Sequence, residues 1–356
     1  MKKLFGILSV MLCATSMSYA QADGIVALQS SDVEMAWNGA AKEKNVIKSG
    51  CCGGLDVRFE LYDDYTLRIY GNGPMATFDY RGEGVVHDSS VPWISEIKKI
   101  KSVVIEDGVT HIGGDSFHGC CELTKVSIPN SVKSIGYDAF RECYALTKVT
   151  IPNSVNHIAE GAFMNCSSLA EVNIPNSVTS IEKFVFNGCG FTELTIPSSV
   201  KSIGKYAFAA CPLEKVNISN GVTSIGDHAF FGTDLEYVKI GKDVTEIGDQ
   251  AFPQYHDEDL VIEFTSETPA TLYNVESLGF LCTIYVPETA LETYLNATFW
   301  KEHADQILPK NKTTGIRSIG FEQSEKKSAI YDLQGNKVTE MQSKGIYIVN
   351  GKKVIK

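Results

Sequence analysis

Apolar and polar residues alternate along short segments of the chain. In the segment Lys148-Val149-Thr150-Ile151, Lys148 and Thr150 are polar and alternate with the apolar Val149 and Ile151. This period of two is typical of a strand that buries one face. Pro152 follows directly, and proline ends a strand because it has no N–H to donate to the ladder. The pattern therefore predicts a strand over 146–151 and a turn after it.

The same segment returns at a nearly constant spacing, and a phenylalanine marks each copy. The steps between these phenylalanines are 23, 23, 23, 22, 22 and 22 residues: Phe117, Phe140, Phe163, Phe186, Phe208, Phe230 and Phe252. One such unit cannot bury its own apolar face, so neighbouring units must stack. We predict a β-rich solenoid of seven repeats over 100–264, in which each coil has a strand and a short helical turn. The phenylalanines should form an internal ladder with a step of about 4.8 Å.

Five repeats also carry a cysteine three residues after the phenylalanine: Cys120, Cys143, Cys166, Cys189 and Cys211. A metal or redox chain is one interpretation, and a column of buried thiols is the other. We favour the buried column, because free cysteine is among the most buried residue types and zinc sites use paired cysteines. Cys51 and Cys52 are adjacent in sequence, and one of them is the better candidate for a disulfide.

The consensus of the repeat is L-x-x-V-x-I-P-x-S-V-x-x-I-G-x-x-A-F-x-x-C, and Leu146 to Cys166 is nearly a full copy. This pattern resembles the BspA-like leucine-rich repeat of bacterial surface proteins, over roughly residues 50–308. The later copies depart from it, with Ser219 and Gly241 in place of the proline. The resemblance implies a right-handed leucine-rich-repeat solenoid and a role in adhesion or interaction.

The ends of the chain differ from the repeats. Lys2 and Lys3 precede an apolar stretch over 4–13 that is too short to span a bilayer, so residues 1–22 are predicted to be a signal peptide. Residues 23–99 should form an N-terminal β cap, with a hairpin made by 56–61 and 66–70. Residues 265–308 should form a C-terminal cap repeat anchored by Trp300, followed by a linker over 309–315.

Residues 316–356 are predicted to be a small basic β tail, with strands within 329–338 and 344–354. Over 310–356 there are ten Lys or Arg against four Asp or Glu, although the whole chain has a net charge of −11. The tail resembles the C-terminal sorting modules of type IX-secreted proteins. That resemblance implies contact with an export machinery and a location outside, or on the outer membrane of, a Gram-negative bacterium. The alternative is an accessory β domain with no sorting role.

Composition and motifs exclude several functions. An acidic chain is a poor candidate for binding nucleic acid, which requires clustered positive charge. The seven histidines show no H-E-x-x-H or similar spacing, and no P-loop, dinucleotide or nucleophile motif occurs. We therefore expect no enzyme activity, no cofactor, no metal site and no transmembrane segment.

The outward positions of the predicted strands remain as the candidate site, because solenoids use such extended surfaces for binding. Two adjacent columns of side chains form it: Lys125, Lys148, Glu171, Glu193, Lys215 and Tyr237 in one, and Ser127, Thr150, Asn173, Thr195, Asn217 and Lys239 in the other. We expect a host protein or glycan at the cell exterior to bind this concave face. The alternative is a structural component of the envelope or matrix that has no specific host ligand.

Overall fold

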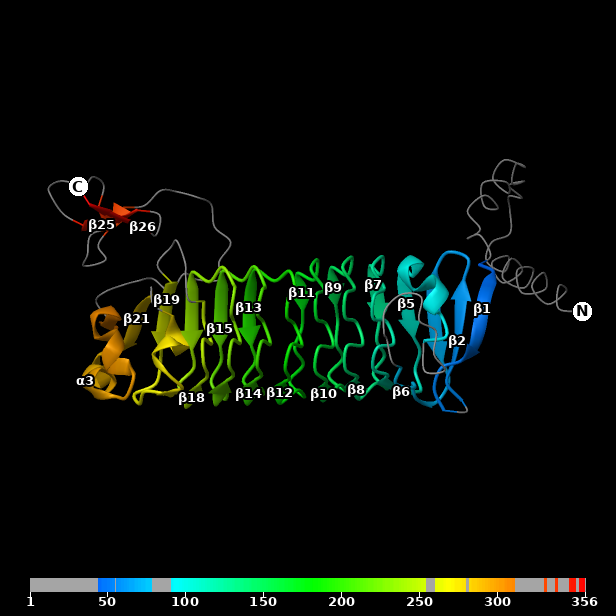
Figure 1. Ribbon diagram of the computed structural model, residues 1–356, viewed down its shortest axis with the longest axis horizontal. Coiled ribbons are helices and arrows are strands. Elements are labelled where there is room, and N and C mark those ends of the chain that lie inside the picture. Colours follow the sequence, from blue (N-terminus) through cyan, green and yellow to red (C-terminus); the bar gives the residue numbers. More distant parts are fainter. Residues whose placement is uncertain are drawn as a thin grey trace, which may run out of the picture. The chain divides into compact units, whose positions relative to one another are not determined.

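The computed structural model describes residues 44–54, 56–78, 91–253, 260–279 and 282–310, and the backbone of four short strands between 330 and 355 (Figure 1). The predicted signal peptide over 1–22 lies outside the described residues, as do residues 311–315 of the predicted linker. All the elements below belong to one compact unit, Asn45–Lys356.

The first elements form the predicted hairpin and lead into the repeats. Strands β1 (Val46–Cys51), β2 (Arg58–Tyr62) and β3 (Thr66–Tyr70) are antiparallel neighbours. β3 then pairs in parallel with β5 (Ser102–Ile105), the strand of the first repeat. The hairpin therefore belongs to the same sheet as the strand of the first repeat.

Each repeat contributes one strand to each of two lines of parallel strands (Figure 1). The first line continues from β5 through β7 (Lys125–Ser127), β9 (Lys148–Val149), β11 (Glu171–Val172), β13 (Glu193–Ile196), β15 (Lys215–Ile218), β17 (Tyr237–Ile240), β19 (Leu260–Phe264), β21 (Cys282–Pro287) and β22 (Ile307–Lys310). The second line contains β4 (Gly73–Pro74), β6 (Val109–Ile112), β8 (Ser134–Ile135), β10 (His157–Ile158), β12 (Ser180–Ile181), β14 (Ser202–Ile203), β16 (Ser224–Ile225), β18 (Glu246–Ile247) and β20 (Thr271–Leu272). Equivalent residues pair across coils, as in Ile196 with Ile218 and Ile218 with Ile240. The predicted solenoid is confirmed.

A third line of contacts between coils lies in the segment around each phenylalanine, where the sequence predicted a short helical turn. The structure has hydrogen-bonded turns there and no helix among the described residues of the repeats. In the second repeat, Asp138 and Glu142 have φ of +49° and +60°, and left-handed residues cannot continue a right-handed helix. The intervening Phe140 donates its N–H to Ala162 O of the next coil at 2.8 Å. The backbone of this segment therefore bonds to its neighbouring coil.

The phenylalanines form the predicted continuous ladder inside the solenoid. All seven are buried, and consecutive rings stack with centroids 5.1 to 5.6 Å apart. Trp93 extends the stack at its N-terminal end, with its ring centroid 5.9 Å from that of Phe117. The core is thus one apolar column rather than a series of separate small cores.

The five repeat cysteines form the predicted column of buried thiols. Cys143 donates its S–H to Phe117 O at 3.3 Å, and Cys166 donates to Phe140 O at 3.1 Å. Burial raises the pKa of the Cys211 thiol to about 12. Cys51 and Cys52, considered for a disulfide, both carry free thiols.

Short helices flank the repeats. A 3₁₀ helix, η1 (Ile94–Lys99), precedes β5. After the repeats come η2 (Val275–Leu278), η3 (Glu288–Ala290), α3 (Leu291–Asn296) and η4 (Trp300–Gln306). Trp300 is fully buried and donates its indole N–H to Ala270 O at 2.7 Å, and it packs edge-on against Tyr294 and Phe264. It anchors the end of the solenoid, as predicted.

The described residues of the tail form four short strands, β23 (Ile330–Tyr331), β24 (Lys337–Val338), β25 (Ile346–Val349) and β26 (Lys352–Ile355). They pair antiparallel in the order β24-β23-β25-β26. Among the described residues of the whole chain, no helix has the length and apolar character needed to cross a membrane.

Candidate functional site: the strand face and an aspartate–histidine cluster

The strand face comprises the twelve predicted site residues on the outward side of the first strand line. Nine are exposed, and Lys215, Asn217 and Tyr237 are half-buried. Side chains between them, such as Leu194 and Val216, are buried in the core. The structure therefore places all twelve residues on one face, as the alternation predicted.

Charged residues of the strand face pair with each other across adjacent coils. The Lys148 ammonium contacts the Glu171 carboxylate, and Lys215 Nζ lies 3.2 Å from Glu193 Oε1. The Lys148–Glu171 pair is largely exposed and the Lys215–Glu193 pair is partly exposed, so solvent screens both and they contribute little free energy. Their consequence is electrostatic, because the opposite charges cancel locally. Lys125 and Lys239 have no ion-pair partner among the described residues.

Two other residues of the face are held by bonds to neighbouring coils. Tyr237 donates its hydroxyl to Glu263 Oε2 at 2.8 Å, and burial together with this bond raises the pKa of the phenol well above its usual range. Asn173 accepts from Ile151 N–H at 2.8 Å and donates to Ile151 O at 2.7 Å. The Asn173 amide thus takes the place of a peptide group in the ladder between coils.

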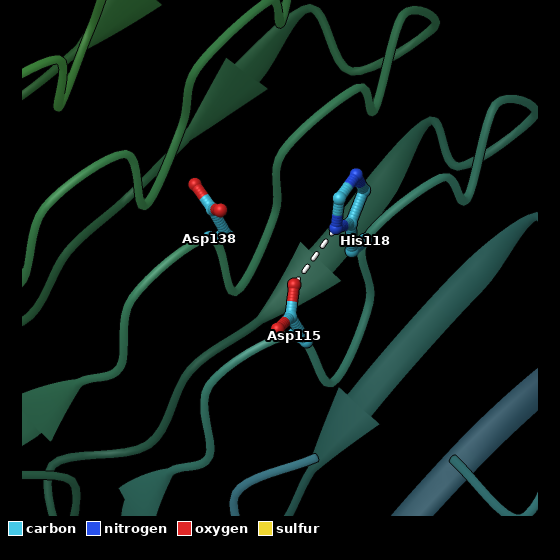
Figure 2. Close-up of side chains that lie close together, drawn as sticks. All are labelled: Asp115, His118 and Asp138. Atoms are coloured by element: carbon cyan, nitrogen blue, oxygen red, sulfur yellow. Dashed lines mark hydrogen bonds and ion pairs between the residues drawn. The ribbon is translucent and has the colours of Figure 1, made fainter. Parts of the chain in front are cut away.

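A cluster that the sequence analysis did not foresee lies in the turns of the first two repeats (Figure 2). His118 Nδ1 is 2.8 Å from Asp115 Oδ1, and both side chains are buried, with 7% and 6% of their surface exposed. Asp138 is one coil further on, and one ligand atom from each of the three residues lies within 4.8 Å of the other two. Asp138 also accepts from Arg141 Nη1 at 3.2 Å. Burial raises the pKa of the Asp138 carboxyl, and the Arg141 charge opposes this effect.

The signal for this cluster is present in the sequence, but only in the register of the repeats. Asp115 and Asp138 are 23 residues apart and occupy the same repeat position, two residues before the ladder phenylalanine. His118 and Arg141 likewise occupy equivalent positions, three residues after each aspartate. Motif searches along the chain miss such a set because its members become neighbours only when the coils stack.

The same repeat position carries aromatic rings further along the solenoid. Phe184, Tyr206 and His228 stand there with φ of +58°, +56° and +55°. Their rings stack with centroids 5.1 and 4.7 Å apart. The position therefore changes from acidic to aromatic while its backbone conformation is kept.

Comparison with known proteins agrees with this architecture. The model of the BspA type leucine rich repeat region matches residues 95–213 and 201–328, with six copies, so the chain belongs to this family. Family membership is consistent with a surface protein, and proteins of this family and fold are generally not enzymes. None of the curated proteins matches the chain.

Two solved structures are similar to parts of the chain. A leucine-rich repeat protein from Bacteroides ovatus is 22% identical, with 68% of this chain and 70% of that chain covered and a TM-score of 0.46. A leucine rich cell surface protein from Faecalibacterium prausnitzii is also 22% identical, with 76% of this chain and 94% of that chain covered and a TM-score of 0.33.

Proposed function

We propose that this protein is exported and binds a macromolecular partner, a host protein or a glycan, through the strand face. The observation that carries the proposal is a row of polar side chains, most of them exposed, on successive coils over one shared core. Lys125 and Lys239 form no ion pair among the described residues, although Lys239 lies opposite Glu263 in the strand register, and Thr150 and Thr195 provide hydroxyls. Such a surface is suited to bind a partner through several hydrogen bonds rather than through one strongly charged group.

The test is a binding screen of the exported chain against host matrix proteins and glycans, followed by charge reversal on one face at a time. The double variant Lys125→Glu with Lys239→Glu reverses the charge of two lysines on the strand face. The matched control is Lys133→Glu with Lys201→Glu, two exposed lysines that directly precede strands of the second line. We expect at least a tenfold loss of affinity for the first pair only. Equal losses for both pairs, or no loss for the first, would contradict the assignment of the strand face.

A structural role in the envelope or matrix is the second candidate, and the internal ion pairs of the strand face favour it. Lys148 with Glu171 and Lys215 with Glu193 satisfy each other without any partner. This candidate predicts self-association or retention in the wall fraction, together with no saturable binding in the screen. Sedimentation and cell fractionation distinguish it from the first.

The route of export forms part of the proposal. The basic start of the chain supports removal of residues 1–22, and the tail over 316–356 supports sorting by contact with an export machinery of a Gram-negative envelope. The intact mass of the exported protein tests the first step, and the export rate of a variant that lacks the tail tests the second. A mass that retains residues 1–22 contradicts the first, and export without the tail at an unchanged rate contradicts the second.

A further inference from the structure

We propose that Asp115, His118 and Asp138 bind one divalent transition-metal ion, and that zinc suits this donor set best. The two aspartates stand at the left-handed position that opens the turn of each repeat, with φ of +54° and +49°. Asp115 N–H donates to Tyr137 O at 2.9 Å, directly before Asp138. This bond holds the two carboxylates one coil apart, and His118 completes the set from the first turn (Figure 2).

The type of donor selects the class of ion. Calcium and magnesium take oxygen ligands almost exclusively, so a buried imidazole is a poor ligand for either. Zinc accepts histidine nitrogen together with carboxylate oxygen, and three protein ligands with one water are a common arrangement. Two carboxylates and one imidazole therefore match a three-ligand zinc site.

The distances are close to those that zinc requires. Zinc lies about 2.0 to 2.2 Å from nitrogen and carboxylate oxygen, so neighbouring ligand atoms in a tetrahedron are about 3.4 Å apart. Asp115 Oδ1 and His118 Nδ1 are now 2.8 Å apart, and all three ligand atoms lie within 4.8 Å. Metal binding would require the Asp138 side chain, which accepts from Arg141, to rotate toward the other two ligand atoms. A glycine at position 161 provides the space for this carboxylate, because a Cβ there would lie 2.0 Å from Asp138 Oδ1.

A carboxylate also lies near the His118 nitrogen that would not bind the metal ion. The ion replaces the proton between His118 Nδ1 and Asp115, so the neutral ring carries its proton on Nε2. Glu142 Oε2 lies 4.0 Å from that nitrogen, and a carboxylate facing the second nitrogen is the usual outer partner of a metal-bound histidine. Asp115, Asp138 and Glu142 bring three negative charges against the single guanidinium of Arg141. A divalent ion balances this excess.

The test is calorimetric titration of the full chain with Zn²⁺, in a Cys51→Ser background that removes, as a competing ligand, the one fully exposed thiol among the described residues. We expect one equivalent to bind, at least tenfold more tightly than Ca²⁺. His118→Ala and Asp138→Asn should each weaken Zn²⁺ binding at least tenfold. His157→Ala, which removes an exposed histidine from the second strand line, should leave it unchanged.

Three results would overturn the proposal: no Zn²⁺ binding at 100-fold excess over protein, unchanged binding in the two site variants, or Ca²⁺ binding as tight as Zn²⁺. Circular dichroism checks that each variant is folded. If the buried His118→Ala prevents folding, Asp138→Asn decides the question, because Asp138 is only half-buried. These outcomes are independent of the partner screen, which probes the strand face.

Discussion

Removal of one ring from the phenylalanine ladder should destabilise the whole solenoid. Phe163 is completely buried between Phe140 and Phe186, with ring centroids 5.2 and 5.6 Å away and nearly parallel planes. Phe163→Ala leaves a cavity that the coils cannot close. The backbone hydrogen bond from Phe163 N–H to Val185 O fixes the spacing between the two coils, so they cannot move together to fill it. A buried phenylalanine replaced by alanine costs about 3–5 kcal/mol, and the two lost ring stacks place the cost toward the upper end.

The control is Lys148→Ala, on the strand face of the same region. About 63% of the Lys148 side chain is exposed, and its partner Glu171 is equally exposed. We expect a change within about 0.5 kcal/mol, because exposed ion pairs contribute little. For a repeat array of this size, each kcal/mol shifts the melting temperature by about 2–4 °C. Phe163→Ala should therefore lower it by about 6–20 °C and Lys148→Ala by no more than about 2 °C.

Circular dichroism gives the overall transition, and two tryptophans report on the two ends. Trp93 and Trp300 are both buried, one beside the first ring of the ladder and the other in the C-terminal cap. Because each repeat contacts only its neighbours, a central cavity should separate the transitions seen by the two residues. Because the chain has a third tryptophan, Trp37, the Trp93→Phe and Trp300→Phe variants are made in a Trp37→Phe background, so that each reports one signal. Equal melting shifts for Phe163→Ala and Lys148→Ala would refute the continuous core.

Three further expectations concern the backbone and the thiols. Gly136→Ala should destabilise by about 2–3 kcal/mol in urea unfolding, because the new Cβ would lie 2.4 Å from Gly114 N. Ala210→Gly should stabilise by about 0.5–1 kcal/mol in the same assay, since Ala210 has φ of +56° and glycine adopts this conformation without strain. The Cys211 pKa of about 12 means that the folded thiol stays protonated while an unfolded thiol ionises near 9. Its contribution to stability should therefore be lost as the pH rises from about 9 to 12, and Cys211→Ser should reduce the slope of stability against pH in that range.

Most of the fold could be predicted because its main signals are periodic. The alternation around Lys148 and Val149 predicted a strand, and the recurrence of Phe163 and its equivalents predicted stacking. The short helical turn was not realised, because the backbone is left-handed at Asp138 and Glu142. Aspartate and glutamate do not mark that conformation as clearly as glycine does. The N–H groups of Asp138, Phe140 and Glu142 donate to carbonyls of the neighbouring coil, whereas those of Arg141 and Cys143 donate within the turn.

For the strand face, too, one part could be predicted from the sequence and another could not. Its position on the outward face follows from the strand pattern, and the structure places all twelve residues there. Their contacts do not follow from that pattern. Asn173 could be counted as a surface amide, yet its side chain bonds to both backbone groups of Ile151. The pairing of Lys148 with Glu171 likewise depends on which coils are adjacent.

The repeat length and the apolar positions are properties of the linear chain, because each coil buries the same positions of its own sequence. The seven predicted repeats undercount the coils, since β19, β21 and β22 continue the parallel line after them. The identity of neighbouring polar groups is a property of the stacked coils. Stacking brings residues 22 or 23 apart in sequence to within one strand spacing of each other. Only in that register do Asp115 and Asp138 share a site with His118, since electrostatic and coordinating interactions depend on distances that the chain order does not contain.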